Sequence, residues 1–234
     1  MGYAAAVAGV ADGNTSSCAT QALATSNGDV IAVGAMCMEI FGGQTITAVT
    51  DTAGNSYSRQ TLAAVSENGA QAEWWVCNNA TGHAANVATI TWSGNARYKS
   101  AVQVRLTGAD NVSPVADADK ASVSGSATVT TPTMTSAGPC TVLAIATSTN
   151  DRSWTPDASP AFTELLDLMV QFGSLSGHLQ YYESASAWND TVTAVASSSS
   201  NCVISAVIIN ANSGAAASDV PRRRQRQLSA LLAM

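Results

Sequence analysis

Charged residues are scarce in this sequence. Only 11% of its 234 residues are Asp, Glu, Lys or Arg, whereas about a quarter of a typical soluble domain is charged. The sequence also lacks any run close to the ~18–20 apolar residues of a membrane-spanning helix. It has no CxxC pair and no histidine at zinc-ligand spacing. We therefore expect no membrane association and predict no metal or cofactor site.

Residues suited to catalysis are equally few. Residues 173–177 have the glycines of a nucleophile elbow, but Leu175 stands where serine is required. The only histidines, His83 and His178, are expected in a loop and at a strand start, as surface or turn residues rather than bases. We therefore predict no catalytic residue and no enzymatic activity.

Two carboxylates leave one enzymatic alternative open. Glu73 and Glu183 lie beside paired aromatic residues, at matching places in the two halves of the sequence. A glycosidase needs two carboxylates at a fixed separation. The preferred interpretation is that each glutamate solvates the outward face of its strand.

Basic charge is concentrated at the C-terminal end, where four of the ten Lys and Arg residues lie within five positions. The rest of the chain then has six basic and sixteen acidic residues, a net charge of −10. Nucleic acid is disfavoured as a partner of this acidic body, because phosphates would be repelled.

The five cysteines are widely spaced and odd in number. Cys37, Cys140 and Cys202 lie inside apolar runs, so buried free thiols are the preferred interpretation. Reduced thiols indicate assembly in a cytoplasm. One disulfide stays open as an alternative.

Short runs of β-branched and small residues recur along the sequence, separated by Gly, Asn, Asp and Ser clusters. They are typical of antiparallel strands joined by tight turns. A hydrophobic share of 46% allows a sizeable core and argues against disorder. Strands are expected at residues 30–40, 45–50, 70–77, 87–93, 100–106, 127–131, 140–146, 177–183, 191–196 and 202–210.

Three segments are less regular. Residues 1–11 lack the basic start of an export signal, so an ordered first strand or arm is expected. Residues 162–172 suit either a helix or a bulged strand, and the strand is preferred because the surroundings are β. Residues 108–125 are expected to form an acidic surface loop, with calcium binding as the less favoured alternative.

A weak internal repeat divides the sequence. Residues 30–106 consist of an apolar strand, an Asp-containing turn, paired aromatics and two further strands, and residues 140–210 repeat that order. The pair at residues 74–75 (WW) corresponds to the pair at residues 181–182 (YY).

No linker-like segment separates the two halves. We therefore predict one antiparallel β-sandwich over residues 1–213, in which both strand sets close over one core as a jelly roll. Two separate sandwiches of under 100 residues each are the alternative.

Motifs of the first half resemble a known module. Residues 46–57 (ITAVTDTAGNSY), 73–75 (EWW) and 78–82 (NNATG) are similar to a recurrent β-sandwich module of bacteriophage structural proteins and some bacterial surface proteins. The pattern extends over residues 28–210, with the sharper motifs in the first half. The resemblance implies a concanavalin-like jelly roll and a virion role, with no catalytic residues to transfer.

Tryptophans are the candidate ligand or interface residues. Trp74 and Trp75 must face opposite sides of a strand, so one is expected in the core and the other, Trp75, outward or in an interface. Trp154 and Trp188 lie in polar contexts and are expected to be exposed. Exposed tryptophans suit sugar stacking or a protein interface, and the interface is preferred.

The C-terminus departs from the sandwich. A connector beginning at residue 214 leads into the arginines and then into a leucine-rich end. Arginines that pair with an acidic surface and leucines that fill a groove are typical of a docking peptide. A disordered end and a nucleic-acid-binding tail are the alternatives. The predicted docking residues are Arg222, Arg223, Arg224, Arg226, Leu228, Leu231 and Leu232.

These features predict a non-enzymatic bacteriophage virion structural protein: a capsid decoration, head-fibre or spike component anchored by residues 214–234. We expect a homo-oligomer that contacts other capsid or tail proteins and is assembled in the host cytoplasm. The alternative is a carbohydrate-binding tail receptor-binding protein or adhesin that recognises a host-surface glycan.

Overall fold

The computed structural model describes residues 1–11, 13–38, 44–60, 64–65, 69–150, 152–170 and 175–212. Within these ranges every regular element is a β-strand, and every strand pairing is antiparallel. The predicted all-β antiparallel class is confirmed. The described part of the chain has no helix that is long and apolar enough to cross a membrane.

The strands fall into two groups along the chain. The first group is β1 (Gly2–Ala11), β2 (Thr15–Ala19), β3 (Leu23–Thr25), β4 (Val30–Met38), β5 (Ile46–Asp51), β6 (Ser58–Arg59), β7 (Ala64–Val65), β8 (Ala70–Cys77), β9 (His83–Asn86), β10 (Ala88–Ala96) and β11 (Lys99–Thr107). The second group is β12 (Val115–Thr130), β13 (Met134–Ser136), β14 (Cys140–Ser148), β15 (Trp154–Pro156), β16 (Thr163–Val170), β17 (Leu175–Ser184), β18 (Trp188–Asp190) and β19 (Thr193–Asn210).

Each group builds one large sheet, and the strand order repeats between them. The first large sheet runs β1-β11-β4-β8-β6, with β7 also on β8; the second runs β12-β19-β14-β17-β16, with β15 also on β19. The registers agree as well, because Val33 lies opposite Trp75 and Val142 lies opposite Tyr182. The repeat expected from the paired aromatics is therefore visible in strand order and pairing.

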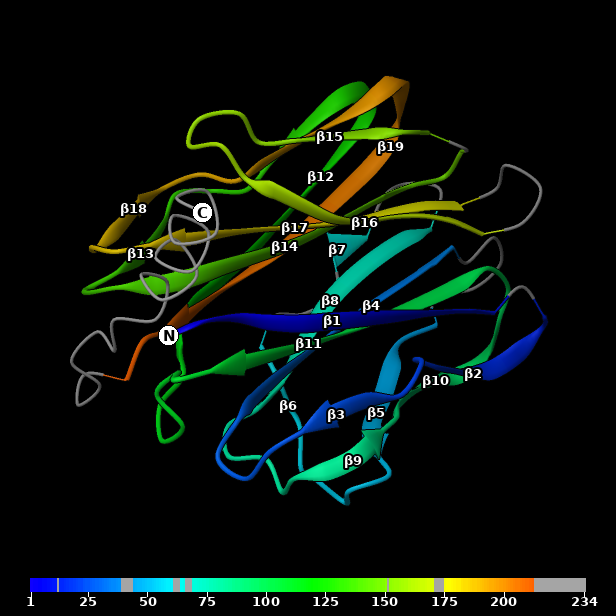
Figure 1. Cartoon of the computed structure of the whole chain (residues 1–234). Coiled ribbons are helices and arrows are strands. Elements are labelled where there is room, and N and C mark those ends of the chain that lie inside the picture. Colours follow the sequence, from blue (N-terminus) through cyan, green and yellow to red (C-terminus); the bar gives the residue numbers. More distant parts are fainter. Residues whose placement is uncertain are drawn as a thin grey trace, which may run out of the picture.

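The two large sheets pack face to face through a shared apolar core, with the first group of strands in the lower part of Figure 1 and the second group above it. Trp74 extends from β8 into this core, and its indole Nε1 donates a 2.9 Å hydrogen bond to the carbonyl of Ser205 in β19. Gly34 allows the close approach, since a Cβ there would lie 2.7 Å from a methyl of Val102 and 3.1 Å from one of Ile145.

Each large sheet is also covered on its outer face. The small sheet β2-β10-β5 covers the first, burying Val33 and Trp75. The β13-β18 pair and neighbouring segments cover the second, burying Val142 and Trp188. The central strands β4, β8 and β14 are therefore buried on both faces. This explains why β4 is a continuous apolar run without alternation. In β8 and β14 a few polar residues, such as Gln71 and Thr141, are buried among the apolar ones.

The predicted β-sandwich is confirmed, with each large sheet built by one half of the chain. This strand order does not establish the jelly roll, which stays a prediction. The strand interpretations of residues 1–11 and of the bulged segment after residue 162 are confirmed by β1 and β16. The expectation of a loop at residues 108–125 is wrong from Val115 onward, because β12 begins there and pairs with β19. Its polar composition reflects an edge strand that partly faces solvent.

Candidate functional site

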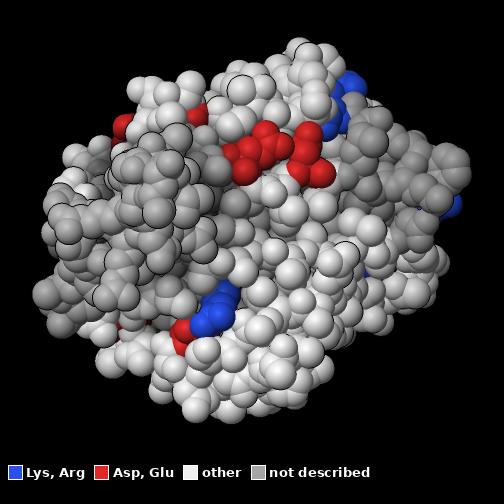
Figure 2. All heavy atoms as spheres, in the orientation of Figure 1, with Lys and Arg blue, Asp and Glu red and all other residues white. Residues whose placement is uncertain are grey.

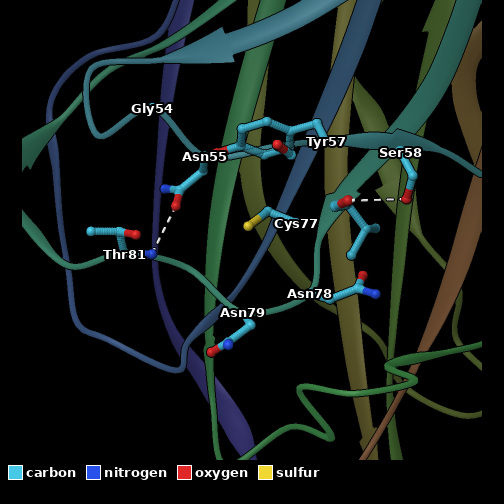
Figure 3. Close-up of a pocket in the computed structure, with 10 residues that line it drawn as sticks. Gly54, Asn55, Tyr57, Ser58, Cys77, Asn78, Asn79 and Thr81 are labelled. Carbon is cyan, nitrogen blue, oxygen red and sulfur yellow. Dashed lines mark hydrogen bonds between the residues drawn. The ribbon is translucent and has the colours of Figure 1, made fainter.

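Two of the three segments that carry the resemblance, residues 46–57 and 78–82, come together in space. Parts of residues 54–58 and 76–81 form the walls of an open depression of about 500 Å³ (Figure 3). The first wall follows β5 and reaches the start of β6, and the second consists of the end of β8 and the segment after it. The lining residues are Gly54, Asn55, Ser56, Tyr57, Ser58, Val76, Cys77, Asn78, Asn79 and Thr81.

The first wall begins with a tight turn. The amide of Gly54 donates to the carbonyl of Asp51 at 3.2 Å, which closes a four-residue β-turn. Gly54 adopts φ = +74°, a left-handed conformation that favours glycine. The turn expected from this motif is confirmed.

The carboxylate of Asp51 organises the wall. It accepts hydrogen bonds from the backbone amide of Asn55 at 2.8 Å and from its side-chain Nδ2 at 2.8 Å. The hydroxyl of Tyr57 donates to it at 2.8 Å, and Nδ2 of Asn86 donates at 2.7 Å. Four donors therefore converge on one carboxylate, which holds the wall in a single conformation.

The ionisation states follow from these contacts. Burial raises the pKa of Asp51, but hydrogen bonds from Asn86, Asn55 and Tyr57 outweigh it, so the pKa lies below its ordinary value. Burial, and then the hydrogen bond to Asp51, raise the pKa of Tyr57 well above its ordinary value. At neutral pH Asp51 is therefore an anion and Tyr57 a neutral donor.

Two asparagines connect the loops. Asn86 in β9 is fully buried, and its Oδ1 accepts from the amide of Ala53 at 3.2 Å. Oδ1 of Asn55 accepts from the amide of Thr81 at 2.7 Å, which joins the two walls (Figure 3). Sequence reasoning missed Asn86, because only the strand pairing brings it to the turn.

The depression offers neutral hydrogen-bonding groups. All ten of its lining residues are uncharged, and Ser56, Asn78 and Asn79 are exposed. Amide and hydroxyl groups beside a tyrosine ring suit a neutral, hydroxyl-rich ligand. An ionised ligand would find no opposite charge among these lining side chains.

The expected exposure of the candidate tryptophans is wrong. Trp154 and Trp188 are each 5% exposed, and Trp75 is 9% exposed. Trp154 and Trp188 pack in the core between the second large sheet and its outer layer, and Trp75 packs in the matching core of the first half. The polar neighbours of Trp188 belong to that outer layer, whereas Trp154 lies in β15, which pairs with β19. Trp74 and Trp75 do face opposite sides of β8, as predicted, since they belong to different cores.

The two glutamates are not brought together. Glu73 is 1% exposed on the outer face of β8, where it pairs with Arg59 at 3.4 Å and accepts from the indole of Trp75. Burial raises the pKa of Glu73, opposed by its contacts with Trp75 and Arg59. Glu183 is exposed on β17 and accepts from the amide of Tyr3 at 2.7 Å. The expectation that Glu73 solvates an outward face is wrong.

The remaining expectations have mixed outcomes. All five cysteines are buried and none forms a disulfide, as predicted for Cys37, Cys140 and Cys202. His83 is exposed, but His178 is fully buried within β17, contrary to its expected surface position. The docking residues between Arg222 and Leu232 lie outside the described residues.

Comparisons with known proteins found no match to the chain among family models, curated proteins or solved structures.

Proposed function

We propose that this chain is a non-enzymatic structural protein of a bacteriophage virion: a capsid decoration, head-fibre or spike component that displays the depression. The supporting observation is that motif residues far apart in sequence form one surface feature, held by the Asp51 contacts. The third motif, residues 73–75, is buried in β8 and supports the second wall from the core. The resemblance of the same motifs to a phage module supplies the virion context, and with it the concanavalin-like jelly-roll class.

The scaffold suits display. Four layers of strand hold the loops, and the central strands are buried on both faces. Assembly as a homo-oligomer beside other virion proteins, after synthesis in the host cytoplasm, belongs to the same proposal. The tail at residues 214–234 is proposed as the anchor.

Incorporation into particles tests the virion role. Particles assembled with the full chain are compared with particles assembled with residues 1–213, using immunoblots of purified particles and electron microscopy. We expect incorporation of the full chain and its loss on truncation. A chain absent from particles overturns the virion role, whereas equal incorporation of both forms overturns only the anchoring role of the tail.

A second candidate function, recognition of a host-surface glycan, is favoured by the uncharged depression. The exposed amides of Asn78 and Asn79 and the hydroxyl of Ser56 are positioned to hydrogen-bond sugar hydroxyls. A recognition site of this kind needs no catalytic group.

Glycan-array binding followed by calorimetry tests this function. The double variant Asn78→Ala/Asn79→Ala is expected to weaken binding by about tenfold or more, since a lost polar contact of 1.4 kcal/mol corresponds to tenfold. Asn189→Ala, an exposed asparagine on β18 outside the depression, is the matched control. Equal affinities of the two variants would place glycan binding elsewhere on the chain.

A further inference from the structure

A cluster of metal-binding side chains lies on the second large sheet, away from the depression. One carboxylate oxygen each of Glu164 and Asp167 and one ring nitrogen of His178 all lie within 4.8 Å of one another. The two carboxylates are exposed on β16, and the imidazole is buried on β17. Figure 2 shows acidic side chains gathered on the face of the molecule where β16 lies in Figure 1.

A β-bulge creates this arrangement. Asp167 lies directly opposite His178 across the strand pair, so their side chains share a face. Residues three apart in a regular strand face opposite sides, which would separate Glu164 from Asp167. The register shifts between Glu164 and Leu166, and the extra residue turns both carboxylates to the side of His178.

His178 has no partner that explains its burial. It is 0% exposed, and within the described part of the chain neither ring nitrogen has a hydrogen-bond partner. Its ring lies against Trp154, with centroids 6.1 Å apart and planes 20° from parallel.

The repeat provides an internal comparison. The position equivalent to His178 in the first large sheet is Gln71, since Cys37 pairs with Gln71 as Ala146 pairs with His178. Gln71 is also buried, but its Oε1 accepts from the thiol of Cys37. The fold therefore accommodates a hydrogen-bonded glutamine at this position and does not itself require a histidine.

We propose that Glu164, Asp167 and His178 bind one divalent transition-metal ion, of which Zn²⁺ is the representative. Ligand atoms 2.0–2.2 Å from Zn²⁺ in a tetrahedron are about 3.4 Å apart. The three ligand atoms lie within 4.8 Å of one another, so binding requires the carboxylates to move closer to the imidazole. An imidazole combined with two carboxylates suits Zn²⁺ or a related ion better than Ca²⁺ or Mg²⁺, which prefer oxygen ligands alone. A bound ion would connect β16 to β17 and fix the edge of the sheet.

Calorimetry of the metal-free full chain with ZnCl₂ tests the site. We expect one Zn²⁺ per chain and a higher melting temperature in its presence. The isosteric double variant Glu164→Gln/Asp167→Asn and the variant His178→Gln are each expected to weaken binding more than tenfold, since even residues that only support a ligand contribute 10–100-fold. The double variant changes exposed side chains only, so it tests the proposal even if His178→Gln does not fold.

The control is His83→Gln, which removes the exposed histidine outside the cluster and is expected to leave the affinity unchanged. Absorption of the Co²⁺-substituted chain should show d–d bands without a thiolate charge-transfer band. A thiolate band, an affinity that His83→Gln weakens as much as His178→Gln does, or the absence of stoichiometric binding would overturn the proposal. Binding of Ca²⁺ that is insensitive to His178→Gln would also overturn it, since the site would then be acidic only.

Discussion

Replacement of Asp51 by asparagine is the sharpest test of how the depression is held. Asp51→Asn keeps the size of the side chain but removes its charge and turns one acceptor oxygen into a donor. The groups that donate to Asp51, from Asn55, Tyr57 and Asn86, would then meet an NH₂ group or lose a charge-assisted contact.

The expected cost follows from the contacts. A hydrogen bond to a charged group contributes about 1.5–3 kcal/mol, but Asp51 is only partly buried, and solvent weakens each contact. With about 1 kcal/mol for each of four non-additive contacts, we expect a loss of about 2–4 kcal/mol in the free energy of unfolding.

Urea denaturation followed by tryptophan fluorescence measures this change. The matched control is Asp190→Asn, an exposed residue whose carboxylate accepts from the adjacent amide of Thr191, and its cost should stay under about 0.5 kcal/mol. If the two variants differ by less than 0.5 kcal/mol, the Asp51 contacts do not stabilise the fold and the reasoning is refuted.

The same substitution should change the acid sensitivity of the protein. Because the pKa of Asp51 is lower in the folded state than in the unfolded state, the unfolded chain binds more protons at acidic pH. The stability from Asp51 is present above the unfolded value, about 3.9, and is lost as pH falls toward the folded value. Asp51→Asn should therefore flatten the decline of stability in that window.

Three further predictions concern the cores. Trp74→Phe removes the indole hydrogen bond to Ser205 and leaves a void between the large sheets. We expect the free energy of unfolding, measured by urea denaturation, to fall by about 2–3 kcal/mol. A fall below 0.5 kcal/mol would contradict the shared core. Gly34→Ala forces a Cβ against Val102 and Ile145. The overpacking should lower the free energy of unfolding by about 1–3 kcal/mol. No change in the same assay would mean that the sheets shift freely. Burial raises the pKa of Cys18 and Cys202 to about 11. A disulfide reagent at pH 8 should therefore label the cysteines only when urea unfolds the chain. Rapid labelling of the folded chain would exclude their burial.

The main strands could be predicted because their physical signal is local. β4, β8 and β14 are buried on both faces. β4 is an apolar run that is recognisable by composition alone, and in β8 and β14 apolar residues outnumber the polar ones. The short outer strands β2, β3, β13 and β18 are rich in Ser, Thr and Asn, and packing on the large sheets determines their conformation. For the same reason the exposure of Trp188, which lies in β18, was predicted wrongly.

The sites depend on contacts between distant parts of the chain. The turn after Asp51 was readable from its own residues, but its partner Asn86 lies 35 positions away and reaches it only through the fold. The Glu164 and Asp167 pair shares a face with His178 only because of a bulge, and no pattern of spacing reveals a single inserted residue.

Because the two halves have the same strand order and each supplies one large sheet, the connection between them determines whether one chain is enough to form the shared core. Residues 108–114 tether β11 to β12, so the halves dock within one polypeptide, at an effective concentration on the order of millimolar. Either half alone would present to water the face that contains Trp74 or Leu143, and exposed apolar faces of this kind promote association. Because of this tether, a single chain can cover both apolar faces. Two halves cut apart would have to associate in solution to cover them.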